Sequence, residues 1–398
     1  MSGIFSGIKV IELASVLAGP SVGQFLAELG AEVIKIESPK TGGDVTRSWK
    51  LSDEIADDIS AYFSSINWGK KSVAIDISTQ EGKDILYRLV GQVDIVIASY
   101  KPGDAEKLGV DYQSLKGIKS DIIYGKITGY GDNVNKVGYD AIIQAEAGFM
   151  DLNGDWDGLP TKMPVALMDI LAGHQLKEAI LMAYINKLQS GEGMEVSVSL
   201  IEAAVASLAN QATNWLVAGR IPKRRGSAHP NIAPYGDIFV TKDDKMIILA
   251  VGTDRQFESL CKCLNINIYE DAKYSINTSR VKNREELKRI LSTAISDTES
   301  EYLLTALNQV NVPIGLVQNV KEALAMPEVA SMFLDADKKG VATFAAHTEK
   351  SLRDSHISPP PKYGQDTQQV LQVYLQISED EVARLGDKGV LAISRSVN

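Results

Sequence analysis

The sequence predicts an α/β fold, with a doubly wound parallel sheet in its first third and a smaller second domain. Short β-branched strands alternate there with apolar-periodic helices, which is typical of parallel strands joined by right-handed crossovers. The 398 residues also exceed what one hydrophobic core usually spans. A hydrophobic fraction of 44% and a charged fraction of 23% are ordinary for a globular protein.

The first β-α-β unit sets this pattern. Residues 8–12 form a strand, a loop at residues 15–20 leads into a helix at 23–29, Gly30 ends that helix, and residues 31–36 form the next strand. The pattern repeats as a strand at 72–77, a helix at 80–90, and strands at 93–98 and 121–128. The first loop lacks the G-x-G-x-x-G spacing, so NAD binding loses its main support.

A long helix at 169–188, a strand at 195–200 and a second helix at 201–217 follow. The basic segment 222–227 is the predicted boundary to the second domain. That domain should hold strands at 236–239, 246–251 and 313–317 and helices at 257–264 and 285–296. A strand at 342–344, a proline-rich linker at 358–361 and a helical tail complete the prediction.

Composition and charge exclude several functions. A net charge of −10 argues against sequence-independent nucleic-acid binding, which needs a basic face. No stretch of 18 apolar residues and no signal peptide occur, so we expect a cytoplasmic protein without a membrane span. Cys261 and Cys263 suit neither a disulfide framework nor a zinc site, and no cluster has metal-ligand spacing.

Several motifs, in order and spacing, are similar to one known family. Residues 10–14, Ala18-Gly19-Pro20 and residues 29–37 resemble the opening of the family III CoA-transferases, which include formyl-CoA transferase, carnitine CoA-transferase and the related α-methylacyl-CoA racemase. Further matches lie at 67–72, 94–96, 100–103, 108–110, 138–140, 191–193, 196–199, 252–257 and 313–317. The resemblance therefore covers nearly the whole chain.

The resemblance implies an interlocked homodimer. Each subunit would have a large Rossmann-like CoA-binding domain from residues 1–222, a small α+β domain from 223–330, and a C-terminal segment, 331–398, that returns to the large domain. Its substrates would be an acyl-CoA and a carboxylic acid, and no metal would be required.

Asp169 is the candidate nucleophile. From the residues alone it could be a helix N-cap or a partly desolvated, reactive carboxylate, and the two are compatible because a helix N-terminus stabilises anions. The resemblance implies that Asp169 attacks the donor thioester to form a mixed anhydride. The released CoA thiolate would then convert that anhydride into an aspartyl-CoA thioester.

The resemblance also implies a CoA site along the opening loop and the strand ends. By motif position its residues are Val16, Ala18, Lys71, Ser99, Tyr100, Lys107 and Leu108, of which the two lysines would meet phosphates. Gly252 and Thr253 are candidates for a glycine loop that shields the site and donates N–H groups to an oxyanion. A simple turn after the preceding strand is the alternative.

Departures from the family pattern bear on specificity. Ser15, Leu17, Ser38 and Lys107 replace a histidine, a glutamine and two arginines of formyl-CoA transferase, which puts formyl and oxalate specificity in doubt. Tyr139 stands where racemases carry a histidine, and a phenol with a pKa near 10 is a poor base for an α-proton. We therefore expect a transferase, with a racemase or a non-catalytic CoA-binding protein as alternatives. The donor and acceptor acids stay unidentified.

Overall fold

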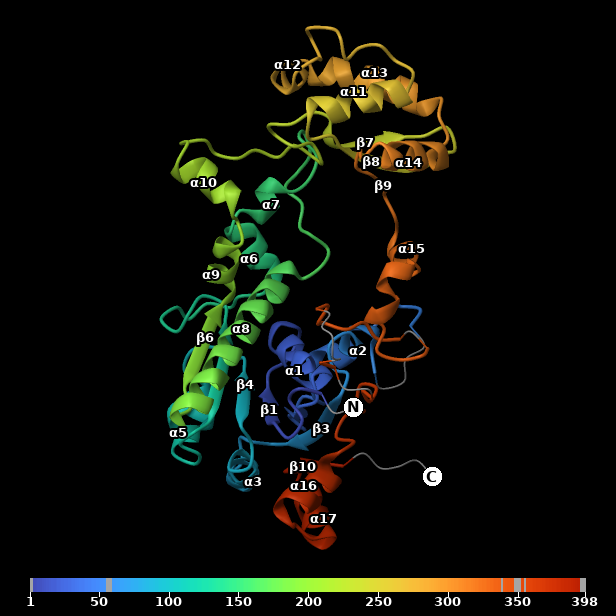
Figure 1. Cartoon of the computed structure of the whole chain (residues 1–398). Helices are drawn as coiled ribbons and strands as arrows, with labels where there is room; N and C mark the ends of the chain where they lie inside the picture. Colours follow the sequence, from blue (N-terminus) through green and yellow to red (C-terminus); the bar gives the residue numbers. More distant parts are fainter. Residues whose placement is uncertain (1–2, 55–58, 338, 347–351, 354–355, 394–398) are drawn as a thin grey trace. The chain divides into compact units, whose positions relative to one another are not determined.

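A computed structural model describes the chain except residues 1–2, 55–58, 338, 347–351, 354–355 and 394–398 (Figure 1). The chain divides into two compact units. The large unit comprises residues 1–148, 163–213 and 331–398, and the small unit comprises 149–162 and 214–330. Residues 149–162 and 214–222, which were predicted to belong to the large domain, group with the small unit.

A seven-stranded sheet forms the centre of the large unit. Its order is β10-β3-β2-β1-β4-β5-β6, and every neighbouring pair is parallel except β10, which runs antiparallel to β3. The strands are β1 (Lys9–Leu13), β2 (Glu32–Glu37), β3 (Lys70–Ile75), β4 (Ile95–Ala98), β5 (Ile123–Thr128), β6 (Glu195–Ser199) and β10 (Leu391–Ala392). The predicted α/β class with a mostly parallel sheet is confirmed.

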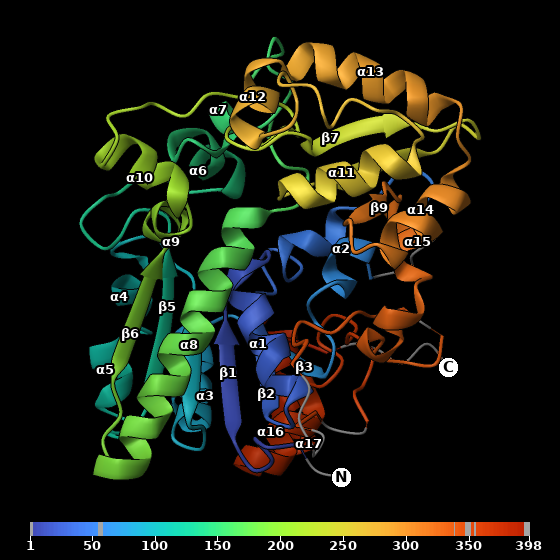
Figure 2. The same ribbon diagram turned by 45° about the horizontal axis from the view of Figure 1, so that its top comes forward.

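Helices cover both faces of this sheet (Figure 2). One face carries α1 (Ala18–Glu28) and α8 (Leu167–Ser190), and the other carries α3 (Gln80–Val90), α16 (Thr367–Leu375) and α17 (Glu379–Asp387). Because both faces are covered, β4 is buried at every residue. A close approach at Gly23 brings α1 against β1, since a Cβ there would lie 1.8 Å from the Glu12 carboxylate.

Shorter elements complete the large unit. They are η1 (Val45–Ser48), α2 (Ala61–Ser64), α4 (Asp104–Leu108), α5 (Tyr112–Lys116), α6 (Asp140–Glu146), α9 (Leu200–Ala206) and η2 (Pro327–Met332), the last ending just inside it. Two predictions here were wrong. The helix at 201–217 is interrupted between α9 and α10 (Asn210–Leu216), because Ala209 adopts a φ of 49° that a helix cannot contain. No strand forms at 342–344, where Val341 makes only an isolated bridge with Phe333.

The small unit has a three-stranded antiparallel sheet, β7-β8-β9, from β7 (Tyr235–Val240), β8 (Met246–Ala250) and β9 (Ile314–Leu316). Its helices are α7 (Phe149–Leu152), α11 (Asp254–Cys263), α12 (Asn277–Lys282), α13 (Arg284–Ser296), α14 (Ser300–Gln309) and α15 (Val320–Leu324). Cys261 is buried in the core between sheet and helices, Cys263 is partly buried, and both are free thiols. No helix in the described ranges has the length and apolarity that a bilayer crossing requires.

Candidate active site

A cavity of about 460 Å³ opens at the carboxyl ends of β1, β2 and β4 in the large unit. Its lining includes Leu13 at the end of β1, residues 14–15 after it, residues of the 38–48 segment after β2, and Ser99 and Tyr100 after β4. The sheet places β2 and β4 on opposite sides of β1, so the connections leave in opposite directions at this point. Ligands of open α/β sheets bind at such a switch point, which makes this cavity the candidate CoA site.

Buried ion pairs hold the first two loops beneath the cavity. Lys35 Nζ lies 2.8 Å from Glu12 Oε1 and 2.9 Å from Asp44 Oδ2, and it donates to the carbonyl oxygen of Ala14. Lys70 Nζ lies 2.8 Å from Glu12 Oε2 and donates to the carbonyl oxygen of Pro20. Both lysines therefore tie a strand carboxylate to the backbone at one end of the opening loop.

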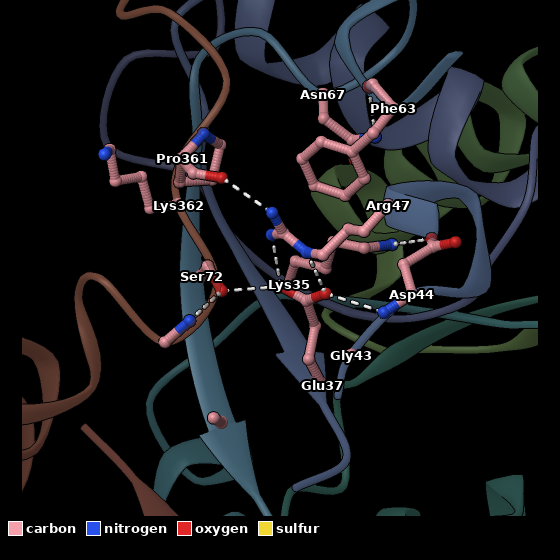
Figure 3. A network of polar contacts seen from close by, with 12 residues as sticks. Lys35, Glu37, Gly43, Asp44, Arg47, Phe63, Asn67, Ser72, Pro361 and Lys362 are labelled. Carbon is pink, nitrogen blue, oxygen red and sulfur yellow. Dashed lines mark hydrogen bonds and ion pairs between the residues drawn. The ribbon is translucent and has the colours of Figure 1, made fainter. Parts of the chain in front are cut away.

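A second pair joins this cluster to the C-terminal segment (Figure 3). The Arg47 guanidinium binds both oxygens of Glu37, at 2.9 and 2.7 Å, and donates to the carbonyl oxygen of Pro361. Glu37 also accepts from the Asp44 N–H, a bond that requires the sharp loop at Gly43, where φ is +94°. A Cβ at Gly43 would lie 2.5 Å from Glu37 Oε1, so only glycine fits.

The opening loop itself is strained. Val16 has a φ of 72°, a conformation that is unfavourable for a β-branched residue. Its N–H is directed at both carboxylate oxygens of Asp44, at 3.3 and 3.4 Å. Such strain persists only where surrounding structure enforces it, and it clusters at functional sites. Val16 is thus held by the same buried charges that line the cavity.

Asp169 lies in the first turn of α8 and is 8% exposed. No hydrogen bond or ion pair to its carboxylate occurs within the described residues. Burial, with a further contribution from the charge of Asp140, raises the pKa of Asp169 to about 7. Asp169 is therefore a desolvated carboxyl group that is partly ionised at neutral pH.

Asp140 contacts the start of α8 and also raises the pKa of Asp169. One of its oxygens accepts from the Met168 N–H at 2.8 Å and the other accepts from the Gln144 side chain at 2.7 Å. The N-cap residue Ala166 has no side chain that could cap the helix, so Asp140 supplies this contact from α6. Asp140 thereby fixes the turn that carries Asp169.

The same end of α8 packs against the opening loop. A Cβ at Gly173, one turn after Asp169, would lie 2.4 Å from Ser21 Oγ and 3.2 Å from the carbonyl oxygen of Ala18. On another side, burial and the charges of Asp169, Asp140 and Asp44 together raise the pKa of Tyr62. Asp169 therefore lies near the first residues of α1 and the Asp44 loop.

The structure brings together only some of the predicted CoA contacts. Ser99 and Tyr100 line the cavity, where burial raises the pKa of Tyr100 to about 12, and Val16 and Ala18 belong to the adjoining loop and helix start. Lys107 and Leu108 lie on α4 outside the cavity lining. In α4, the Lys107 side chain is 77% exposed and pairs with Asp104.

Lys71 lies elsewhere. It is the second residue of β3, and its ammonium pairs with Glu32, the first residue of β2. This pair lies toward the amino ends of the strands, whereas the cavity lies at their carboxyl ends. Nothing in this arrangement brings Lys71 to the cavity, so a contact with a CoA phosphate there would require a different path for the cofactor.

Gly252, Thr253 and Tyr139 are the remaining predicted residues, and the first two begin a helix. Gly252 and Thr253 both donate their N–H groups to the Gln256 side chain, as part of the capping box that begins α11. These N–H groups are thus occupied and are not free oxyanion donors. Tyr139 is 62% exposed and precedes α6 without capping it through its side chain.

Sequence reasoning missed several residues of this site. Glu12 and Lys35 carried a signal, since each is a charged residue flanked by apolar residues within a strand, where it must be paired if buried. Lys70, the first residue of β3, carried a weaker one. Asp140 had a weaker one, as part of the Gly-Tyr-Asp motif. Tyr62, in the short helix α2, had none.

Comparison with known proteins identifies the family. A family model described as CoA-transferase family III matches residues 5–367. The chain belongs to this family. It is 41% identical over 382 residues to the succinate–glutarate CoA-transferase of Agrobacterium fabrum, which covers 92% of this chain and 94% of that protein. It is 33% identical to the succinyl-CoA:glutarate CoA-transferase of Mus musculus, over 97% of this chain and 89% of that one.

A solved structure agrees with this family III assignment. A CAIB/BAIF family protein from Brucella suis superposes with a TM-score of 0.83 at 36% identity, over 94% of this chain and all of that one. The protein is therefore a CoA-transferase acting between acyl-CoA and carboxylic acids. Within the described residues, no group of three or more His, Cys, Asp or Glu side chains could hold a metal ion.

Proposed function

We propose that this family III CoA-transferase uses Asp169 as a covalent carrier, first of the acyl group and then of CoA. The Asp169 carboxylate attacks the donor thioester, and the CoA thiolate leaves as the aspartyl anhydride forms. The thiolate then attacks the aspartyl carbonyl, releasing the donor acid and leaving an aspartyl-CoA thioester. The acceptor carboxylate attacks this thioester, which expels the CoA thiolate and forms a second anhydride. The thiolate then attacks the acceptor carbonyl of that anhydride, which releases the new acyl-CoA and regenerates the Asp169 carboxylate.

One observation carries this proposal: Asp169 is a buried carboxyl group with no ion-pair partner among the described residues. A carboxylate whose pKa is near 7 is more basic, and hence more nucleophilic, than one at its ordinary value of 3.8, yet a substantial fraction is ionised at neutral pH. The strained opening loop and Ser99 and Tyr100 are proposed to hold CoA beside it.

Trapping with hydroxylamine tests the intermediates. Incubation with a donor acyl-CoA alone should place an anhydride or thioester on Asp169, and hydroxylamine should convert either into a stable hydroxamate on the peptide spanning 168–170. Asp169→Asn should give no hydroxamate and no turnover while it still binds CoA. Turnover by Asp169→Asn, with no label on the unmutated enzyme, would refute the mechanism.

We infer that dicarboxylic acids are the substrates, because the Agrobacterium and mouse relatives are both named for succinate or succinyl-CoA and glutarate. Succinyl-CoA as donor and glutarate as acceptor are the first pair to assay, against oxalate and short monocarboxylates. Rapid transfer to oxalate with none to glutarate would contradict this choice. The family resemblance further supports an interlocked, cytoplasmic homodimer, which analytical ultracentrifugation tests, since linked subunits should give no folded monomer on dilution.

A further inference from the structure

A second cavity, of about 770 Å³, lies wholly within the small unit. The segment after α7, the basic segment 223–228, β7 and the first turn of α13 surround it. Its volume is within the range of small-molecule sites. The transferase mechanism assigns no role to any residue of this cavity.

The lining is cationic in a chain that is acidic as a whole. Five basic side chains, at 223, 224, 225, 284 and 288, face three acidic ones, at 151, 237 and 285, an excess of two positive charges. The whole chain carries a net charge of −10. The excess positive charge around this cavity favours the binding of an anion.

Two of the basic side chains are used by the fold. Arg224 donates to the carbonyl oxygens of Asp151, Asp155 and Gly158, which fixes the segment after α7. Arg284 donates to the carbonyl oxygens of His229 and Ile232. The Nε of Arg284 is also buried without a hydrogen-bond partner among the described residues, which is costly.

The other three, Lys223, Arg225 and Lys288, form no ion pair within the described residues. Lys288 lies one turn into α13, whose N-terminal end contributes a partial positive charge to the same cavity. Lysine and arginine together, with arginine able to bind in a bidentate manner, are the usual partners of phosphate groups.

Trp156 supplies the remaining feature. It lines this cavity and is 77% exposed, which is unusual for a residue that is normally packed. An exposed indole beside arginines and lysines provides a face for a planar base, and base–aromatic stacking contributes about 1–3 kcal/mol. Basic side chains that can bind phosphate, together with an aromatic ring on which a base can stack, favour a ligand that has both phosphate groups and a planar base.

We propose that this cavity of the small unit binds a nucleotide, with its phosphates against Arg225, Lys288 and Arg284 and its base against Trp156. Two sources share this chemistry: a free nucleoside diphosphate, and the phosphorylated adenosine part of a second CoA molecule, bound apart from the one proposed for the large unit. The second source rests on the proposed transferase function, and the first does not.

Titration calorimetry of the full-length protein with ADP tests the proposal. Arg225→Glu and Lys288→Glu should each weaken ADP binding by about tenfold or more, since each replaces an attraction of roughly 1.4 kcal/mol with a repulsion. Arg289→Glu is the matched control, because it makes the same change on the neighbouring residue of α13 outside the cavity lining. Trp156→Ala should weaken ADP more than pyrophosphate.

Absent ADP binding, or binding that none of the three cavity variants weakens, overturns the proposal. Competition titration with CoA separates the two sources, because CoA displaces ADP from this cavity, and loses that ability in the same variants, only if CoA is an occupant. Failure of the transferase function would appear differently, as absent turnover in the unmutated enzyme whatever its nucleotide binding. Melting temperatures close to that of the unmutated protein exclude misfolding.

Discussion

Two groups of buried carboxylates lie close together in the large unit, and their surroundings differ completely. Burial alone would raise the pKa of Glu37 and of Asp44, but Arg47 at Glu37 and Lys35 at Asp44 outweigh it and hold both pKa values below their ordinary range. At Asp169 no cation among the described residues compensates, and burial with the Asp140 charge raises the pKa to about 7. The same chemical group is structural where it is paired and reactive where it is left alone.

The largest expected effect comes from removing the unpaired carboxylate. Asp169→Asn keeps the volume of the side chain but is a far poorer nucleophile, so kcat should fall by at least about a thousandfold. Steady-state assays with succinyl-CoA and glutarate measure this loss. A fall of less than tenfold would place the nucleophile elsewhere.

The same variant should be more stable than the unmutated protein at neutral pH. Because burial favours protonated Asp169, its stabilising contribution is present below the unfolded pKa of about 4 and is lost as the pH rises through about 7. Above pH 7 the Asn variant should gain up to about 4 kcal/mol in free energy of unfolding, and near pH 4 nothing. Urea unfolding at both pH values measures the difference, and equal stability at pH 8 would contradict the burial argument.

Removing a charge from the paired group should lower the stability of the protein, whereas removing the Asp169 charge should raise it. Lys35→Met leaves Asp44 without its cation and Glu12 with Lys70 alone, and breaking such a buried pair should cost about 3–5 kcal/mol. Lys388→Met is the control, because its pair with Glu81 is exposed and should contribute little to stability. Urea unfolding measures both, and equal losses would show that the buried network is not structural.

These two groups also show how far the sequence could predict the molecule. The alternation of strands and helices predicted the parallel sheet, because period and length are local properties of β1, α1 and β2. Asp169 was identified through a motif. Its lack of a partner, however, depends on which side chains from α2, α6 and α1 approach α8, and no local pattern records such long-range contacts.

Lys71 shows where prediction from a sequence motif reaches its limit. A lysine beside a family motif suggests a phosphate contact, but the register of β3 against β2 decides which end of the sheet it reaches. The break at Ala209 is similar, since an alanine gives no local signal for a positive φ. Neither the strand register nor this backbone conformation can be read from the neighbouring residues in the sequence.

A moderate effect should follow from Asp140→Asn. Asn keeps an acceptor for the Met168 N–H but removes the negative charge, so the pKa of Asp169 should fall. For the unmutated enzyme, kcat/KM should decline about tenfold per pH unit below about 7, because the nucleophile must be ionised. In Asp140→Asn that decline should begin at lower pH, whereas Asp84→Asn on α3 should leave it unchanged. An unshifted profile would exclude Asp140 as a source of the raised pKa.

The smallest effect is expected at Lys71. Its motif position predicts a contact with a CoA phosphate, whereas its place in the sheet predicts none. Its pair with Glu32 is partly exposed, with 37% of the lysine side chain and 31% of the glutamate accessible, so it should contribute at most about 1 kcal/mol to stability. Because the pair lies toward the amino ends of the strands, Lys71→Met should change the KM for acyl-CoA by less than about twofold, well under 1 kcal/mol of binding free energy.

Lys40 provides the comparison for this variant. It follows β2, beside the cavity, and its side chain is 63% exposed with Asp76 as its partner. If CoA lies across the carboxyl ends of the strands, Lys40→Met should raise the KM for acyl-CoA by a larger factor than Lys71→Met, because only Lys40 can approach a phosphate there. The reverse order, with a tenfold rise for Lys71→Met, would mean that CoA extends past the sheet to its amino end. Comparing the two variants therefore tests where CoA lies on the sheet as well as whether Lys71 contacts it.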